Sequence, residues 1–173
     1  MTEAALLDAR TGRLLRTTPI GPAGFEFSAP PSNAVAVNEQ SGRAFVVNAR
    51  DGAVYVLNTR TGQVRRRIPL GQAIQPIAMD PQVSRVFVGG PRCVGVLDAG
   101  SGRLVGRVAL GADPTAIAVD ERWGWVAVTS QGVRWDQSAG RLAATSLGQF
   151  TVVDARRLTA RRIVPVGVAP GRW

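Results

Sequence analysis

The chain has 173 residues, 45% hydrophobic and 19% charged, and its 21 basic against 12 acidic residues give a formal charge of +9. This apolar content is typical of a soluble globular domain and not of a disordered tail. All 21 basic residues are arginine, histidine is absent, and Cys93 is the single cysteine. These absences exclude a Ser-His-Asp or Cys-His pair, lysine-dependent phosphate motifs, an internal disulfide and the usual zinc, haem and copper sites.

No targeting or membrane segment is predicted. The first ten residues, Met1–Arg10, carry Glu3 and Asp8 and lack a basic stretch followed by an apolar one, so they do not resemble a signal peptide. The uncharged run Ile68–Met79 has 12 residues and contains proline and glutamine, which makes it too short and too polar to span a bilayer. The sequence leaves the cellular compartment open.

Two kinds of repeat unit alternate along the chain. An 18-residue unit occurs four times without gaps, at Ala4–Gly21, Val54–Gly71, Val94–Gly111 and Phe150–Gly167. A 15-residue unit occurs three times, as AVAVNEQSGRAFVVN, PIAMDPQVSRVFVGG and AIAVDERWGWVAVTS. Both units place Asp or Asn at the fifth position, and the longer one has glycine at the ninth position except at Leu158. Such regular self-similarity is typical of a repeat architecture.

Each unit is predicted to form a β-hairpin. Short alternating segments such as Val54–Leu57 and Ala44–Val47 are rich in β-branched and aromatic residues, and turn clusters such as Asn58–Gly62 separate them. Two hairpins make four strands per repeat, and equivalent positions such as Asn58 and Asp98 are 40 residues apart. Four short strands in about 40 residues are typical of a β-propeller blade.

The predicted fold is therefore all-β, an open arc or fragment of a β-propeller with about three four-stranded blades and one half-blade. The segments are an outer half-blade at 1–21, blades at 33–71, 75–111 and 114–167, and the start of a next blade at 168–173. Insertions around Pro22–Ser32 and Gln131–Ser146 are expected to be loops between strands. Because propellers close with four to eight blades, the chain is expected to be a truncated piece or to need a partner.

The repeats resemble a known family. The segments Ala116–Asp120, Arg43–Asn48 and Gly52–Asn58, with the Thr-Gly turns at positions 11–12 and 61–62, are similar to YVTN-type β-propeller repeats. The resemblance spans nearly the whole chain and implies a propeller architecture. It is compatible with surface proteins, binding modules and parts of enzymes, and members of the family are often exported.

The arginine excess has two interpretations. Arg65–Arg67, Arg103 and Arg107, Arg161 and Arg162, and Arg13 and Arg16 all fall in or beside the last strand of a repeat. Charged edge strands discourage aggregation, which favours a solvated rim. A belt that binds polyanions is the alternative, but few aromatic side chains lie between these arginines in the sequence as stacking platforms would. Nucleic acid is thus not an expected partner.

The repeated turn residues are interpreted as structural. Carboxylates suit Mg²⁺ and Ca²⁺, but these lie at equivalent turn positions in separate hairpins, which favours hairpin capping over a metal site. Gly62 and Gly102 are expected to have positive φ. We predict no metal, no cofactor and no catalytic residue. The predicted structural turn residues are Asp8, Gly12, Asn38, Asn58, Gly62, Asp80, Asp98, Gly102, Asp120 and Asp154.

One candidate binding segment lies in the second insertion, where Arg134, Trp135 and Asp136 combine an aromatic ring with opposite charges. The alternative is that this tryptophan packs on its own blade. Trp123 and Trp125 interrupt the usual pattern of their hairpin and are expected to have a packing role. Cys93 is expected to be a free thiol without a catalytic use.

Three hypotheses for function remain open. The first is a non-enzymatic scaffold or interaction module whose propeller is completed by a protein partner or by self-association. The second is part of a propeller enzyme, for instance a metal-assisted, lactonase-like hydrolase, although the innermost strands carry no acids before their terminal turns. The third is an arginine-mediated binder of polyanions.

Overall fold

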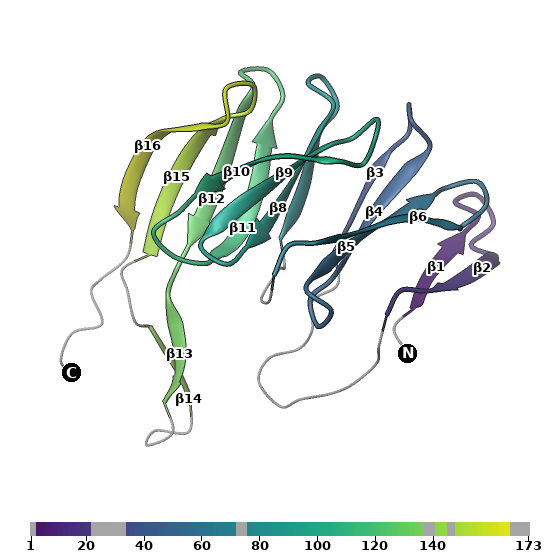
Figure 1. Cartoon of the computed structure of the whole chain (residues 1–173), viewed down its shortest axis with the longest axis horizontal. Helices are drawn as coiled ribbons and strands as arrows, with labels where there is room; N and C mark the ends of the chain where they lie inside the picture. The colour runs from purple at the N-terminus through teal and green to yellow at the C-terminus, as the bar shows by residue number, and fades with distance from the viewer. Residues whose placement is uncertain (1–2, 22–33, 72–75, 137–140, 145–147, 167–173) are drawn as a thin grey trace.

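The computed structural model describes residues 3–21, 34–71, 76–136, 141–144 and 148–166, which form sixteen strands (Figure 1). No helix among these residues is long and apolar enough to cross a membrane. The strands are β1 (Glu3–Leu7), β2 (Leu14–Pro19), β3 (Val35–Asn38), β4 (Arg43–Asn48), β5 (Ala53–Asn58), β6 (Val64–Pro69), β7 (Ile77–Asp80), β8 (Arg85–Gly90), β9 (Cys93–Asp98), β10 (Leu104–Ala109), β11 (Pro114–Asp120), β12 (Trp125–Ser130), β13 (Val133–Asp136), β14 (Arg141–Ala144), β15 (Gly148–Asp154) and β16 (Thr159–Val166).

Three antiparallel sheets of four strands each form the body of the molecule. We call β3-β4-β5-β6 the first sheet, β7-β8-β9-β10 the second sheet and β11-β12-β15-β16 the third sheet. β1 and β2 form a separate two-stranded half-sheet ahead of them. The sheets fan out side by side in chain order (Figure 1). The all-β class, with three four-stranded units and a two-stranded one in an open arc, is as the sequence predicts.

The second insertion is not a loop, and here the sequence prediction is wrong. Residues 133–136 and 141–144 pair as the antiparallel hairpin β13–β14, with Val133 opposite Ala144 and Asp136 opposite Arg141. This hairpin leaves the third sheet between β12 and β15 and extends away from it (Figure 1). The first insertion, around Pro22–Ser32, and the expected next blade at 168–173 lie outside the described residues.

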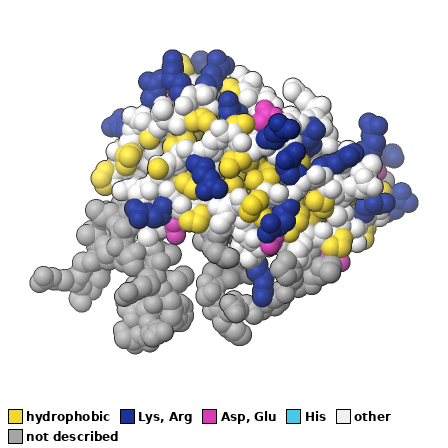
Figure 2. Space-filling model, viewed as in Figure 1, with side chains coloured by type: hydrophobic (Ala, Val, Ile, Leu, Met, Phe, Trp, Pro, Cys, Tyr) yellow, Lys and Arg dark blue, Asp and Glu magenta, His cyan; other side chains and the backbone are white. Residues whose placement is uncertain are grey.

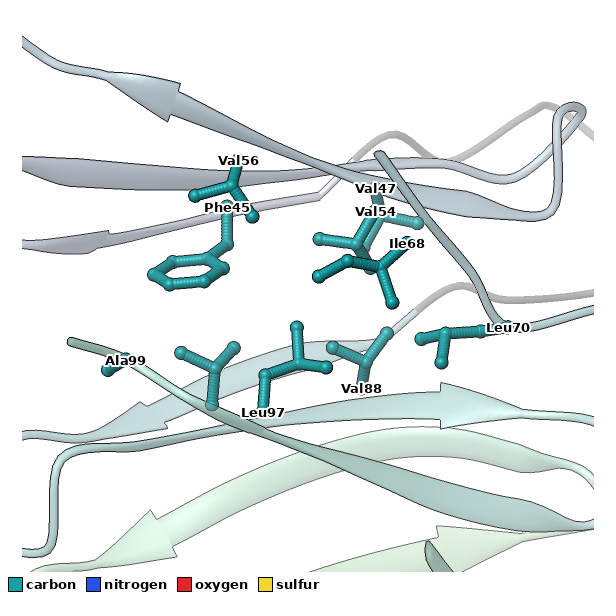
Figure 3. Close-up of a cluster of buried hydrophobic side chains, with 10 residues drawn as sticks. Phe45, Val47, Val54, Val56, Ile68, Leu70, Val88, Leu97 and Ala99 are labelled. Carbon is teal, nitrogen blue, oxygen red and sulfur yellow. The ribbon is translucent and has the colours of Figure 1, made fainter. Parts of the chain in front are cut away.

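The hydrophobic core consists of layers between neighbouring sheets. Phe45 and Val56 of the first sheet face Val88 and Leu97 of the second across one layer (Figure 3). A second layer joins the second sheet to the third and includes Phe87, which is fully buried. Because side chains alternate between the faces of a strand, one strand such as β8 supplies both layers, with Val88 on one side and Phe87 on the other. The middle sheet is therefore apolar on both faces.

Candidate functional site

Turns closed by Asp or Asn lie together at one end of the sheets, which we call the turn rim. In each turn the side-chain Oδ1 accepts a backbone N–H two or three residues further on. The bond lengths include 2.9 Å from Arg60 N to Asn58 and 2.9 Å from Gln82 N to Asp80. The residues that accept such bonds are Asp8, Asn38, Asn58, Asp80, Asp98, Asp120 and Asp154. These carboxylates and amides therefore stabilise the reversal of the chain, as the Asx-turn rule predicts.

The glycines of the rim turns have the backbone conformation that the sequence predicts. Gly62 and Gly102 both have φ of 68°, in the left-handed region. Leu158 occupies the equivalent position of the third sheet with φ of 58°, so this turn holds a side chain in a conformation that L-residues rarely adopt. The turn is thus conserved in shape across the three sheets although one residue has changed.

Hydrogen bonds to the charged form lower the pKa of two rim carboxylates in the blades, Asp98 and Asp154. Hydrogen bonds from Ser101 lower the pKa of Asp98. The pKa of Asp154 lies far below its usual range because of backbone hydrogen bonds from its turn and ion pairs with Arg161 and Arg157, at 3.0 and 3.2 Å. Among the described residues no three His, Cys, Asp or Glu side chains gather where they would hold a metal ion.

Two hollows open on the turn rim at equivalent places in the repeat. The first groove, about 270 Å³, lies between the first and second sheets, and the rim cleft, about 340 Å³, lies over the third sheet. The first groove is lined by Ser41, Arg43, Val56, Asn58, Arg65, Arg66 and Ser101. The lining of the rim cleft includes Gln82, Arg122, Trp123, Trp125, Asp154, Arg156, Arg157 and Arg161.

The two tryptophans of the rim cleft are exposed, which corrects the expectation that they pack. Trp123 is 63% exposed and Trp125 is 48% exposed. Their ring centroids are 6.3 Å apart, and the Arg122 guanidinium lies 5.4 Å from the centroid of the Trp123 ring. Arg122 and Trp123 are neighbours in the sequence, and the fold adds Arg157 and Arg161, which are distant in the sequence, to the same cleft. The unusual Trp-Gly-Trp in the third 15-residue unit was the one available signal.

The two ends of the arc expose positions that are buried in the other repeats. On the third sheet we call the side away from the second sheet the trailing face. Its residues Ala127, Phe150, Val152 and Val164 are half-buried and Val166 is 41% exposed. The equivalent residues of the second sheet are all buried against the third sheet: Phe87, Val94, Val96, Val108 and Leu110.

At the opposite end, Leu7 of the half-sheet is 55% exposed. Its equivalents are buried, with Leu57 at 6%, Leu97 at 0% and Val153 at 1% exposed. We call this side of the half-sheet the leading face. Each end of the arc thus presents a side that, elsewhere in the same chain, packs against a neighbouring sheet.

Several solved structures share this arrangement. Hydrazine synthase of Kuenenia stuttgartiensis matches with a TM-score of 0.64 and 16% identity over 88% of this chain and 40% of its own. The structure of U3-55K matches with a TM-score of 0.62 and 10% identity, and Sqt1 of Saccharomyces cerevisiae with 0.59 and 13%. They cover 82% and 79% of this chain, which spans 42% and 35% of theirs. The fold is a β-propeller arc.

These likenesses concern the fold alone, since the identities are low, and the chain spans about two fifths of the length of the structures it matches. No family model and no curated protein matches the chain. The YVTN-type resemblance remains a resemblance.

The arginines that the sequence assigns to outer strands lie on β2, β6, β10 and β16, the last strands of their units, or just before β2 and β10. Figure 2 shows basic side chains spread over one face of the molecule among hydrophobic ones. Two of the arginines on the last strands are paired. Arg161 contacts the Asp154 carboxylate at 3.0 Å. Arg67 contacts the Asp51 carboxylate at 2.8 Å, and Tyr55 donates a hydrogen bond to the Asp51 carboxylate as well. This pairing lowers the pKa of Asp51. Most of these edge arginines remain exposed to solvent.

The candidate segment Arg134, Trp135 and Asp136 lies on β13, in the hairpin that extends from the end of the third blade opposite the turn rim (Figure 1). The structure therefore does not bring it together with Trp123, Trp125 or the turn residues. Cys93 begins β9 as a half-buried free thiol whose pKa is raised by burial. A raised pKa lowers the fraction of the thiol that is ionised, and the thiolate is the reactive form of cysteine.

Proposed function

We propose that the chain is a non-enzymatic β-propeller scaffold that binds a protein partner through its end faces. The supporting observation is the difference between equivalent positions. Val94 and Val96 of the second blade are 1% and 0% exposed, whereas Phe150 and Val152 of the third blade are only half-buried. An apolar sheet face of this kind is stabilised by covering it with another sheet, because burial of apolar area is favourable.

The shape required of the partner follows from the repeat. The trailing face has the residue pattern that the second blade uses to bind the third, so a further propeller blade would fit it. The leading face around Leu7 has the pattern that the other blades use to bind the preceding one. A second copy of this chain offers both patterns and is the simplest partner, in a head-to-tail contact between the trailing face of one copy and the leading face of the other.

A scaffold is preferred to an enzyme because the rim carboxylates accept hydrogen bonds within their own turns through Oδ1. Asp80 and Asp120, for example, each accept two backbone N–H groups through Oδ1. The likeness to hydrazine synthase does not bear on this choice, since the propeller fold supports many functions.

Sedimentation velocity over a concentration series tests the proposal. We expect the 18.3 kDa chain to sediment as a species larger than a monomer at high concentration. The Phe150→Asp variant places a charge on the trailing face and should sediment as a monomer. Val105→Asp changes an exposed valine on an edge strand, and it should associate like the wild type. Circular dichroism establishes that both variants are folded.

The result that would overturn the proposal is a wild-type chain that stays monomeric at all concentrations, binds no added propeller chain and unfolds cooperatively. Equal association of the wild type and Phe150→Asp would show that the contact lies elsewhere.

A further inference from the structure

The lining of the first groove carries more uncompensated positive charge than that of the rim cleft, which includes Glu121 and Asp154. Arg43, Arg65 and Arg66 line the first groove, a hollow of about 270 Å³. None of the three forms an ion pair with a carboxylate of the described residues, whereas Arg67 on the same strand pairs with Asp51. The lining contains no acidic side chain and is completed by Ser41, Val56, Asn58 and Ser101.

The charge is uncompensated because the turn residue is asparagine. Asn58 stands where the equivalent units have Asp8, Asp98 and Asp154. Its Oδ1 still accepts the N–H groups of Arg60 and Thr61, both at 2.9 Å, so the turn keeps its shape and loses only the negative charge. In the second blade Arg85 is the equivalent of Arg43, and there it lies opposite Asp98 and contributes to lowering the pKa of that carboxyl.

The first groove is open because the ninth residue of the 18-residue unit in the second blade is glycine, which has no side chain to fill the space. Gly102 lies against Val56, and a Cβ on Gly102 would be 3.1 Å from a methyl group of Val56. The equivalent residue of the third blade is Leu158, and its Cδ1 lies 2.8 Å from the place that a Cβ on Gly106 would occupy. Leu158 therefore fills the corresponding space between the second and third blades. Of the two hollows, only the first groove has no acidic side chain in its lining, because Glu121 and Asp154 line the rim cleft.

From the coincidence of open space and uncompensated charge we propose that the first groove binds a small ligand bearing phosphoryl oxyanions, held by Arg43, Arg65 and Arg66. Guanidinium groups present planar pairs of N–H donors that match the oxygens of a tetrahedral phosphate. The Asn58 side chain uses its oxygen for the turn and leaves its Nδ2 as a further donor. The site lies away from both end faces and does not depend on the docking proposed above.

The size of the groove limits the ligand. Drug-sized molecules usually occupy pockets of roughly 300–1,000 Å³, so a hollow of about 270 Å³ suits one or two phosphoryl groups with little attached to them. Both free pyrophosphate and a phosphoester such as a nucleoside diphosphate carry this chemistry.

Calorimetric titration at low ionic strength, with inorganic pyrophosphate as the probe, tests the site. Asn58→Asp keeps the acceptor of the turn and adds the carboxylate that the second blade has, so we expect the affinity to fall by about tenfold or more. Gln149→Glu, on β15 at the end opposite the turn rim, makes the same change of charge and should bind nearly as the wild type does. Gly102→Leu should also abolish binding, by filling the groove as Leu158 fills the next one. Its melting curve shows whether the variant is folded.

A second titration with ADP distinguishes the two sources of the oxyanion. Tighter binding of ADP than of pyrophosphate would indicate a phosphoester ligand, and equal or weaker binding would indicate the free anion. The proposal is overturned if the wild type binds neither probe. It is also overturned if Asn58→Asp and Gln149→Glu weaken binding equally, because that outcome reports only the net charge of the chain.

Discussion

The second and third blades carry the same repeat and differ in what covers them. The core residues that the second blade turns toward the third are buried, including Phe87 and Val96 at 0% exposure. The same positions of the third blade, such as Val152 and Val166, are half-buried or exposed. The hydrogen-bonded ladders of the two sheets are equally complete, with four antiparallel strands in each.

The difference shows that a blade completes its hydrogen bonds by itself but not its burial. Backbone pairing is satisfied within each sheet, whereas the apolar faces become a core only when another sheet lies against them. The stability of such a chain is therefore concentrated in the layers between blades. Residues in those layers should respond strongly to substitution, and their equivalents at the ends of the arc should respond weakly.

The largest expected effect comes from emptying the layer between the second and third blades. Phe87→Ala removes a fully buried ring and should lower the free energy of unfolding by about 3–5 kcal/mol. Phe150→Ala, on the half-buried trailing face, should cost less than half as much when measured by urea unfolding of dilute protein. Equal losses would mean that the trailing face is covered as completely as the interior, which would remove the difference between the two blades.

A smaller effect is expected at two turn glycines that differ in whether a neighbouring side chain lies against them. Gly12 and Gly62 both have φ of 68°. A Cβ on Gly12 would meet nothing within 4 Å, whereas a Cβ on Gly62 would lie 2.7 Å from the Arg16 Cδ of the half-sheet. We expect Gly12→Val to cost about 1 kcal/mol through backbone strain, and Gly62→Val about 2 kcal/mol because Arg16 must also move. Thermal melts of the two variants measure the difference, and a Gly62→Val variant that melts with the wild type would contradict the assigned register.

The next effect depends on pH. The pKa of Asp154 is depressed in the folded state, so this residue stabilises the fold above its unfolded pKa of about 3.9 and loses that contribution as the pH falls through the folded value. Asp154→Asn keeps the turn acceptor and removes the ion pairs with Arg157 and Arg161, which are largely exposed. The variant should be less stable by about 1 kcal/mol at pH 7, and the difference should shrink below about pH 4.

Urea unfolding of both proteins between pH 2.5 and 7 measures this. Asp98→Asn is the matched control in the second blade, where the described residues show no ion pair to the carboxylate, and its loss should be smaller. A difference between wild type and Asp154→Asn that stays constant down to pH 2.5 would show that the ion pairs contribute nothing.

The blades were predictable from the sequence because their signals are local. Alternating segments such as Val54–Leu57 and turn residues such as Asn58 and Gly62 each determine a structure within a few residues. Repetition then reinforces each signal several times over. The hairpin β13–β14 occurs once, without this reinforcement, and the sequence pattern predicts a loop in its place.

The hollows of the turn rim were not predictable in this way, because they depend on which residues two separate segments bring together. The exposure of Trp123 depends on what covers the third blade, and the openness of the first groove depends on Gly102, 44 residues after Asn58. The substitutions of Asp by Asn at 58 and of Gly by Leu at 158 were visible as departures from the repeat. Only the packing of neighbouring blades shows that Asn58 changes the charge of the first groove and that Leu158 fills space between the second and third blades.

The smallest expected effect is that of calcium, for which we predict no change in the melting temperature at millimolar concentration. The oxygen ligands that a Ca²⁺ ion would need are carboxylates and carbonyls in numbers of six to eight. The rim carboxylates of Asp80 and Asp120 each already accept two N–H groups, and they belong to turns of different blades. A ligand that binds the folded state must raise the melting temperature, so binding would be detected even without a known activity. A rise of several degrees that is lost in Asp80→Ala or Asp120→Ala would contradict the prediction, and it would show that the turn carboxylates of neighbouring blades act together instead of each stabilising its own hairpin.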